Sequence, residues 1–252
     1  MAGALSELTK RVFKKDFRSI QPEQSRIILV EAQDRVLGTY SKFSSAKAKA
    51  SLEKLGVEMR LGQPVENIAE ERIIIGDETI EAASIIWTAG VEANPLVRDL
   101  PCEHNRKGQV PVEPDGSLPG HPNVFAIGDI ADLTDPNGVK VPGVSPAAMQ
   151  MGKHVAKIIR RELDDADRTR PAFTYRDKGS MATIGRSAAV AEIGKLKFSG
   201  FPAWFLWLVV HLVFLIGFRN RLAVLIQWLY AYIKYRPGAR VFERPTNKNQ
   251  SS

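Results

Sequence analysis

Apolar runs alternate with a helical pattern in the first part of the chain, in the order strand, helix, strand. The run Ile27–Val30 predicts a strand that ends at Glu31, and Val57–Leu61 predicts a second strand. Between them, the Ala/Lys-rich stretch Ser41–Leu55 predicts a helix that Gly56 ends. This order is typical of a βαβ unit with parallel strands, so the sequence predicts an α/β fold.

Two further strand signals follow before residue 91. Two short runs, Arg72–Ile75 and Glu78–Ala82, flank Gly76-Asp77 and predict a hairpin. The run Ser84–Thr88 predicts another strand, and Ala89 and Gly90 come directly after it. Small residues at a strand end allow a flat ring to approach the backbone.

A strand, a Gly-Asp pair and a helix start are also closely spaced in the second half. The apolar run Val124–Ile127 predicts a buried strand, after which come Gly128 and Asp129. Further on, Ser145 is a good N-cap, and Pro146 fits the first helical position, with Ala147 next. A helix that begins there directs its positive dipole end toward a ligand beside Asp129. We interpret the stretch as a cofactor site; the alternative is an ordinary turn.

The C-terminal part is apolar and aromatic. Phe201–Phe218 carries no formal charge and is at the short limit for a membrane span, and Leu222–Tyr235 predicts a second helix. The residues expected to meet a bilayer surface are aromatic or basic: Trp204, Trp207, Arg219, Arg221, Trp228 and Tyr232. We interpret the pair as amphipathic helices lying in the interface. The alternatives are a single tilted span and a buried helix pair in a soluble protein.

The distribution of charge along the chain supports the interpretation of the C-terminal helices as lying on a membrane surface. Residues 195–252 contain nine Lys or Arg and one acidic residue, a net +8 in a chain of net +7, so the rest carries −1. A basic tail on a neutral body predicts an anionic lipid surface as partner and no nucleic acid.

Cys102 is the only cysteine, which excludes a redox-active cysteine pair within this chain. The four His and one Cys predict no metal site, and residues 1–10 do not predict a signal peptide.

Several motifs together resemble one family. VFAIGD at 124–129 followed by GVSPAAMQ at 143–150, IIWTAG at 85–90 with Asn94-Pro95, YRDKGSMATIGR at 175–186 and the Trp-rich C-terminal segment are similar to type II NADH dehydrogenases. These are single-subunit, FAD-dependent NADH:quinone oxidoreductases with two dinucleotide-binding domains. No G-x-G-x-x-G turn occurs in the chain, so the resemblance is to the C-terminal part of such an enzyme.

The resemblance implies a role for each candidate residue, and no catalytic side chain. FAD would be bound by Gly128, Asp129, Ser145, Pro146 and Ala147. NADH would be bound by Glu31, Ala89 and Gly90. In dinucleotide-binding folds, an acidic residue at the end of the strand accepts hydrogen bonds from the ribose hydroxyls, which is the position of Glu31. The alternative for Glu31 is a solvent-facing residue at a turn. The family carries two glutamines at the helix start; Pro146 replaces the first, and Gln150 is the second, expected beside quinone.

The expected fold class is therefore α/β: incomplete Rossmann-like dinucleotide-binding domains with a C-terminal amphipathic helical membrane anchor. The expected parts are a partial NADH-binding domain (1–100), the C-terminal part of an FAD-binding domain with a small antiparallel unit (101–194), and anchoring helices with a polar tail (195–252). The expected activity passes electrons from NADH through FAD to membrane quinone without proton pumping, at the cytoplasmic face of the cell membrane, with a homodimer left open. The alternatives are an inactive membrane-attached fragment and a peripheral membrane binding protein without its own flavin.

Overall fold

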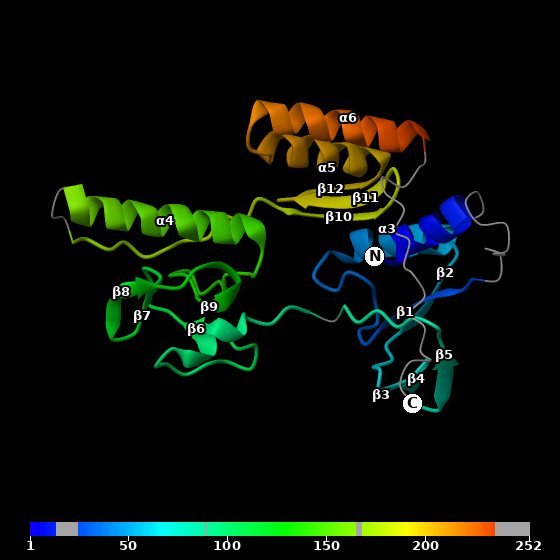
Figure 1. The fold of residues 1–252 in the computed structure, drawn as a ribbon, viewed down its shortest axis with the longest axis horizontal. Helices are drawn as coiled ribbons and strands as arrows, with labels where there is room; N and C mark the ends of the chain where they lie inside the picture. The colour runs from blue at the N-terminus through cyan, green and yellow to red at the C-terminus, as the bar shows by residue number, and fades with distance from the viewer. Residues whose placement is uncertain (14–24, 89, 165–167, 235–252) are drawn as a thin grey trace, which may run out of the picture. The chain divides into compact units, whose positions relative to one another are not determined.

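The computed structural model describes residues 1–13, 25–88, 90–164 and 168–234. These residues form two compact units (Figure 1). The first unit combines Met1–Ile85 with Gly179–Ser252, and the second is Ile86–Lys178. The expected division at residues 100 and 194 stays a prediction.

The first unit contains the predicted βαβ motif. Its elements are β1 (Ile27–Glu31), α3 (Lys42–Lys54) and β2 (Val57–Leu61), and β1 and β2 pair in parallel. Ser41 is the N-cap of α3, where its side chain accepts from the Ser44 N–H. The α/β prediction is therefore confirmed.

A small antiparallel sheet follows β2. It consists of β3 (Asn67–Ala69), β4 (Arg72–Ile75) and β5 (Glu78–Glu81), with β4 in the centre. The hairpin between β4 and β5 is confirmed, while β3 was not predicted. Ahead of the βαβ motif, the chain forms α1 (Ala2–Glu7) and the π-helix η1 (Leu8–Phe13).

A second antiparallel sheet lies between helices. Its strands are β10 (Ser180–Gly185), β11 (Ala188–Ile193) and β12 (Leu196–Gly200), with β11 in the centre. Val190 of β11 is fully buried in a cluster with Ala48 and Leu52 of α3. Ala189 and Ala191 belong to a different cluster, which includes Ala203 of α5. The alternation places α3 on one face of the strand and α5 on the other (Figure 1).

The aromatic segment forms two helices, α5 (Phe201–Phe214) and α6 (Phe218–Lys234). The chain turns between the two helices at Gly217, which has φ +86°. Within the described ranges, no helix combines the length and apolar character needed to cross a membrane. Among the residues of these helices whose burial is described, 201–233, Ala203 alone is buried, which differs from the alternative of a buried pair.

Aromatic contacts hold α6 against α5 and the sheet. Trp207 stacks on Trp228 with ring centroids 5.6 Å apart, and Trp204 lies 5.4 Å from Tyr232. The Arg186 guanidinium, in the β10–β11 turn, lies 4.2 Å from the Tyr232 ring centroid and donates to the Ala231 carbonyl at 3.2 Å. This turn therefore attaches the last part of α6 to the sheet.

Replacing Tyr232 with alanine is expected to loosen α6. The variant loses the cation–π contact, the 2.6 Å hydrogen bond between the Tyr232 and Ser187 hydroxyls, and the ring contact with Trp204. Together these contacts are worth about 2 kcal/mol, so backbone hydrogen exchange in α6 should accelerate by roughly tenfold or more. Tyr230→Ala is the matched control, because Tyr230 is on the same helix and 55% exposed. Equal acceleration in both variants would contradict the attachment.

The second unit is built on one long helix and short strands. Its elements are η3 (Pro95–Asp99), β6 (Val110–Pro111), β7 (Ser117–Leu118), β8 (His121–Phe125), the 3₁₀ turn η4 (Gly128–Ile130), β9 (Ala131–Asp132) and α4 (Ser145–Asp164). The buried face of α4, with Ala147 and Met151, packs on Val110 and Leu133.

One strand prediction is wrong and another is met only in part. Ser84–Thr88 forms no strand, and Trp87 is 65% exposed. Of the predicted buried strand Val124–Ile127, only Val124 and Phe125 belong to a strand, the end of β8, and Val124 and Ile127 are 43% and 37% exposed. An apolar run becomes a buried parallel strand only when neighbouring strands pair with it. Among the described residues, no strand pairs with 84–88, and β8 pairs only with the short β7.

Candidate functional site

The predicted Gly-Asp pair lies against the start of α4. Gly128 has φ +71°, and a Cβ added there would lie 3.2 Å from the Ala148 Cβ, so glycine suits both the turn and the close approach of the helix. Asp129 is exposed, and the Cβ position of Gly143 is 3.5 Å from its Oδ1. The carboxylate thus stands next to two glycines and the first turn of a helix.

The helix start differs in detail from the prediction. α4 begins at Ser145, and the Val144 carbonyl accepts from the N–H groups of Ala147 and Ala148 at 3.0 and 3.1 Å. The capping position is therefore Val144, one residue earlier than predicted, because its carbonyl accepts the first helical hydrogen bonds. Pro146 has no N–H, so α4 offers a ligand mainly its dipole, with few free N–H groups.

The surroundings of Asp129 suit a group that is both flat and polar. Apolar side chains are exposed at the start of α4, with Val144 42% and Met149 49% accessible. The Gln109 side chain donates to the carbonyl oxygens of Asp129 and Ala131 at 3.0 and 3.3 Å, which fixes the turn. An exposed carboxylate on a fixed turn, a helix dipole, glycine gaps and open apolar side chains fit an isoalloxazine ring with a hydroxylated stem.

The Gln150 side chain forms two hydrogen bonds that the sequence did not predict. Its side-chain amide donates to the Arg176 carbonyl and accepts from the Arg176 N–H, both at 3.1 Å. This two-point bond fastens the segment after residue 172 along α4. A contact between Gln150 and quinone stays a prediction.

The candidate NADH residues fall in both units. Glu31 is the last residue of β1, as predicted, and its carboxylate accepts from the Gln33 N–H at 3.0 Å. Gly90 belongs to the second unit and has φ +146°. Ala89 lies outside the described residues. A role for these residues in NADH binding remains a prediction.

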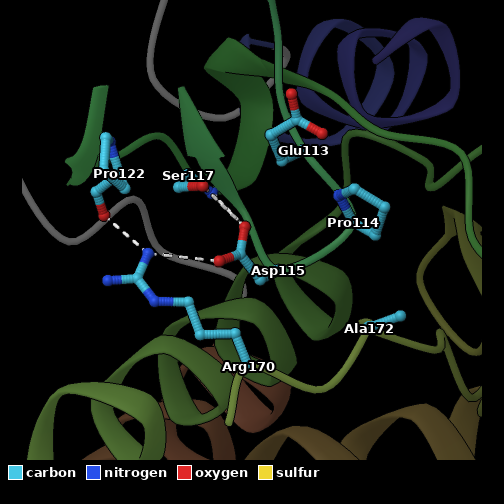
Figure 2. Close-up of a pocket in the computed structure, with 7 residues that line it drawn as sticks. All are labelled: Glu113, Pro114, Asp115, Ser117, Pro122, Arg170 and Ala172. Atoms are coloured by element: carbon cyan, nitrogen blue, oxygen red, sulfur yellow. Dashed lines mark hydrogen bonds and ion pairs between the residues drawn. The ribbon is translucent and has the colours of Figure 1, made fainter. Parts of the chain in front are cut away.

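A cavity of about 320 Å³ lies near the other end of α4 (Figure 2). Arg170 lines it and donates to both oxygens of Glu162, to Asp115 at 3.2 Å and to the Pro122 carbonyl at 2.6 Å. Its guanidinium also lies 5.3 Å from the Phe125 ring centroid. Two carboxylates neutralise this arginine, so we assign the network a role in stability.

The network should make the fold sensitive to acid. Burial disfavours ionisation of Asp115, but hydrogen bonds from the Ser117 hydroxyl and N–H and from Arg170 outweigh it and hold the pKa of that carboxyl below its usual value. Because the native pKa is the lower one, the stabilisation is present above about pH 4 and is lost as the pH falls through the native pKa.

Asp115→Asn is expected to lower the free energy of unfolding by about 2 kcal/mol at neutral pH, because a charged hydrogen bond to Arg170 is lost. The difference from wild type should shrink at about pH 3. Urea unfolding at both pH values checks this. Asp164→Asn is the control, since its ion pair with Arg160 is exposed. A constant difference at all pH values would contradict the assignment.

Comparison with known proteins identifies the family. Residues 1–152 match the sequence model of the family described as pyridine nucleotide-disulphide oxidoreductase. The chain belongs to this family. Residues 178–237 match the NDH2 C-terminal domain.

Relatives within the family are type II enzymes. The chain is 42% identical to the type II NADH:quinone oxidoreductase Ndh of Mycobacterium tuberculosis, with 94% of this chain and 52% of that protein aligned. It is 40% identical to NdhA of the same organism, over 90% and 50% of the two chains. The chain thus spans about half the length of the curated relatives it matches. The resemblance to the C-terminal part of type II NADH dehydrogenases is confirmed.

A solved structure shares the fold. NDH2 from Plasmodium falciparum, in complex with NADH, superposes with a TM-score of 0.84 over 95% of this chain and 64% of that chain, at 16% identity. At this identity the likeness concerns the fold alone, and it supports the dinucleotide-binding α/β class.

Several residues around the candidate site were not predicted. Gly143, Gln109 and Arg176 each contact a predicted residue, yet they lie 14 to 26 positions away from it in the chain. Gly143 was within the motif GVSPAAMQ, so that glycine was a usable signal. The contacts of Gln109 and Arg176 depend on the folded chain and had no local signal.

Proposed function

We propose that this chain forms part of a type II NADH:quinone oxidoreductase, in which it supplies portions of the FAD, NADH and quinone sites. The observation that carries the proposal is the grouping of Gly128, Asp129, Gly143 and the start of α4 in one unit. Bound FAD would supply the hydride and electron transfer chemistry. The inactive fragment is not favoured, because the similarity extends over nearly the whole chain.

The residues of this chain would bind and orient the substrates. The Asp129 carboxylate would accept hydrogen bonds from hydroxyls on the flavin stem, and the α4 dipole would favour negative charge on the reduced ring. Glu31 would accept from the ribose hydroxyls of NADH and disfavour a 2′-phosphate. Since the Gln150 amide is bonded to Arg176, we propose that it shapes the quinone site by holding that segment.

The exposed apolar side chains of α5 and α6 support attachment to a lipid surface. Phe205, Val209 and Val213 recur at every fourth position of α5 and are 38 to 57% exposed. On α6, Leu225 and Leu229 are 41% and 58% exposed. Apolar stripes next to Arg219 and Arg221 suit a monotopic helix pair on anionic lipid. The cytoplasmic face of the cell membrane belongs to this proposal as well.

One experiment tests the electron-transfer role. The chain is expressed alone and, separately, joined to the part of the M. tuberculosis Ndh that precedes the aligned region. The joined protein should purify with flavin absorbance and reduce a soluble quinone with NADH in preference to NADPH. A folded joined protein without flavin and without quinone reduction would contradict the proposal. The chain alone shows how much of the FAD affinity its own residues supply.

A further inference from the structure

A second cavity, of about 300 Å³, lies on α4 in the second unit and is lined by basic side chains. Lys153, His154 and Lys157 come from α4, and Arg176 comes from the extended segment beside it. We call these four residues the basic groove. The remaining lining residues are uncharged: Gln150, Phe173 and Thr174.

The charge of the groove is uncompensated. Among the residues that the structure describes, neither the lysines nor the Arg176 side chain forms an ion pair, and no acidic residue lines the cavity. In the cavity at Arg170, by contrast, the positive charge of the guanidinium is compensated by ion pairs with Asp115 and Glu162. Lys153 and Lys157 are also four positions apart on one helix, an arrangement in which like charges repel. An anion in the groove would remove this repulsion.

The groove is held in shape before any ligand arrives. The Gln150 amide fastens the Arg176 backbone to α4 by two hydrogen bonds. His154 Nε2 donates to the Pro171 carbonyl at 2.9 Å, since a carbonyl oxygen can only accept. The His154 ring also meets the buried Phe173 edge-on, with centroids 5.5 Å apart. A pre-organised site loses less entropy on binding than a set of free surface lysines.

We propose that the basic groove binds a phosphate group, either of a free phosphorylated compound or of an anionic lipid headgroup. Lys153 and Lys157 supply point charges, Arg176 supplies a planar donor pair, and the Thr174 hydroxyl is a further donor. The volume admits a phosphate with a small organic substituent. The groove shares Gln150 and Arg176 with the segment that we propose shapes the quinone site, but Lys153 and Lys157, the residues changed in the test, belong to none of the proposed FAD, NADH and quinone sites.

The test compares a groove variant with a control of equal charge. The groove variant is K153Q/K157Q, and the control is R106Q/K107Q, which removes two exposed charges from a loop of the same unit. Calorimetric titration with inorganic phosphate at low ionic strength is the first measurement. Sedimentation with phosphatidylcholine vesicles, with and without phosphatidic acid, is the second. Circular dichroism confirms that both variants fold.

We expect K153Q/K157Q to weaken phosphate binding by roughly tenfold or more and R106Q/K107Q to change it by less than about twofold, because charged hydrogen bonds are lost only in the groove. Weaker binding to phosphatidic acid vesicles in the groove variant would assign the lipid headgroup. Unchanged vesicle binding together with weaker phosphate binding would assign a free compound. If phosphate does not bind and vesicle binding is unaffected, or if both variants lose affinity equally, the proposal is wrong.

Discussion

Replacing Phe205 and Leu229 with glutamate is expected to weaken binding to anionic vesicles by on the order of a hundredfold or more, because about 1.5 to 3 kcal/mol of apolar burial is lost at each site. Each residue is on a different helix of the proposed anchor and is more than half exposed, at 54% and 58%. The new carboxylates would also be repelled by the anionic leaflet. Neither substitution should disturb the buried contact of Ala203 with the sheet.

Vesicle sedimentation at several fractions of phosphatidylglycerol measures this effect. The matched control is L96E/L163E, which places two glutamates at residues of the second unit that are each 79% exposed. This control should bind like wild type. Equal binding of both variants would contradict the anchor proposal. Point substitution is preferable to deleting the helices, because deletion would uncover the face of β11 that α5 covers.

Asp129→Ala is expected to reduce the flavin content of the joined protein by roughly tenfold or more, since charged hydrogen bonds to a ligand contribute about 1.5 to 3 kcal/mol. The carboxylate is exposed, so its removal should leave the free energy of unfolding nearly unchanged. Flavin absorbance per polypeptide after gel filtration measures the loss. A large loss of flavin with an intact fold would locate the effect in ligand binding.

Asp129→Asn and Asp99→Asn complete this test. Asparagine keeps the size of the side chain and one acceptor oxygen, so Asp129→Asn should fall between wild type and the alanine variant. Asp99 is exposed on η3 and serves as the charge-matched control. Unchanged flavin content in the alanine variant would remove Asp129 from the proposed site.

The sequence predicted those parts of the fold whose signals are local. α3 follows from the Ala/Lys-rich composition of 41–55 and a stop at Gly56, and the β4–β5 hairpin follows from a turn at Gly76. The strand at 84–88 was wrong and the strand at 124–127 was right only for its first two residues, because an apolar run does not reveal whether a pairing strand is present. The break between α5 and α6 was placed too late, at Arg219, because the apolar pattern continues through Gly217.

The sequence predicted the motif of the candidate site, but it did not predict the long-range contacts that hold the second unit together. Gly128, Asp129 and the start of α4 are close in sequence, and the structure brings them together as expected. The ion pair between Asp115 and Arg170 joins residues 55 positions apart, and the two-point bond of Gln150 joins residues 26 positions apart. Such contacts depend on how the chain folds back, which no local pattern encodes.

The two-sided burial of β11 limits how far the proposed membrane helices can move independently. Ala189 and Ala191 face α5, and Val190 faces α3, so one layer of sheet separates α5 from the helix between β1 and β2. Layers packed face to face lie about 10 Å apart. If α5 rests in lipid, its depth therefore sets the height of α3 and Glu31 above the bilayer. NADH would then be received at a fixed distance from the lipid, without a hinge between the two helices.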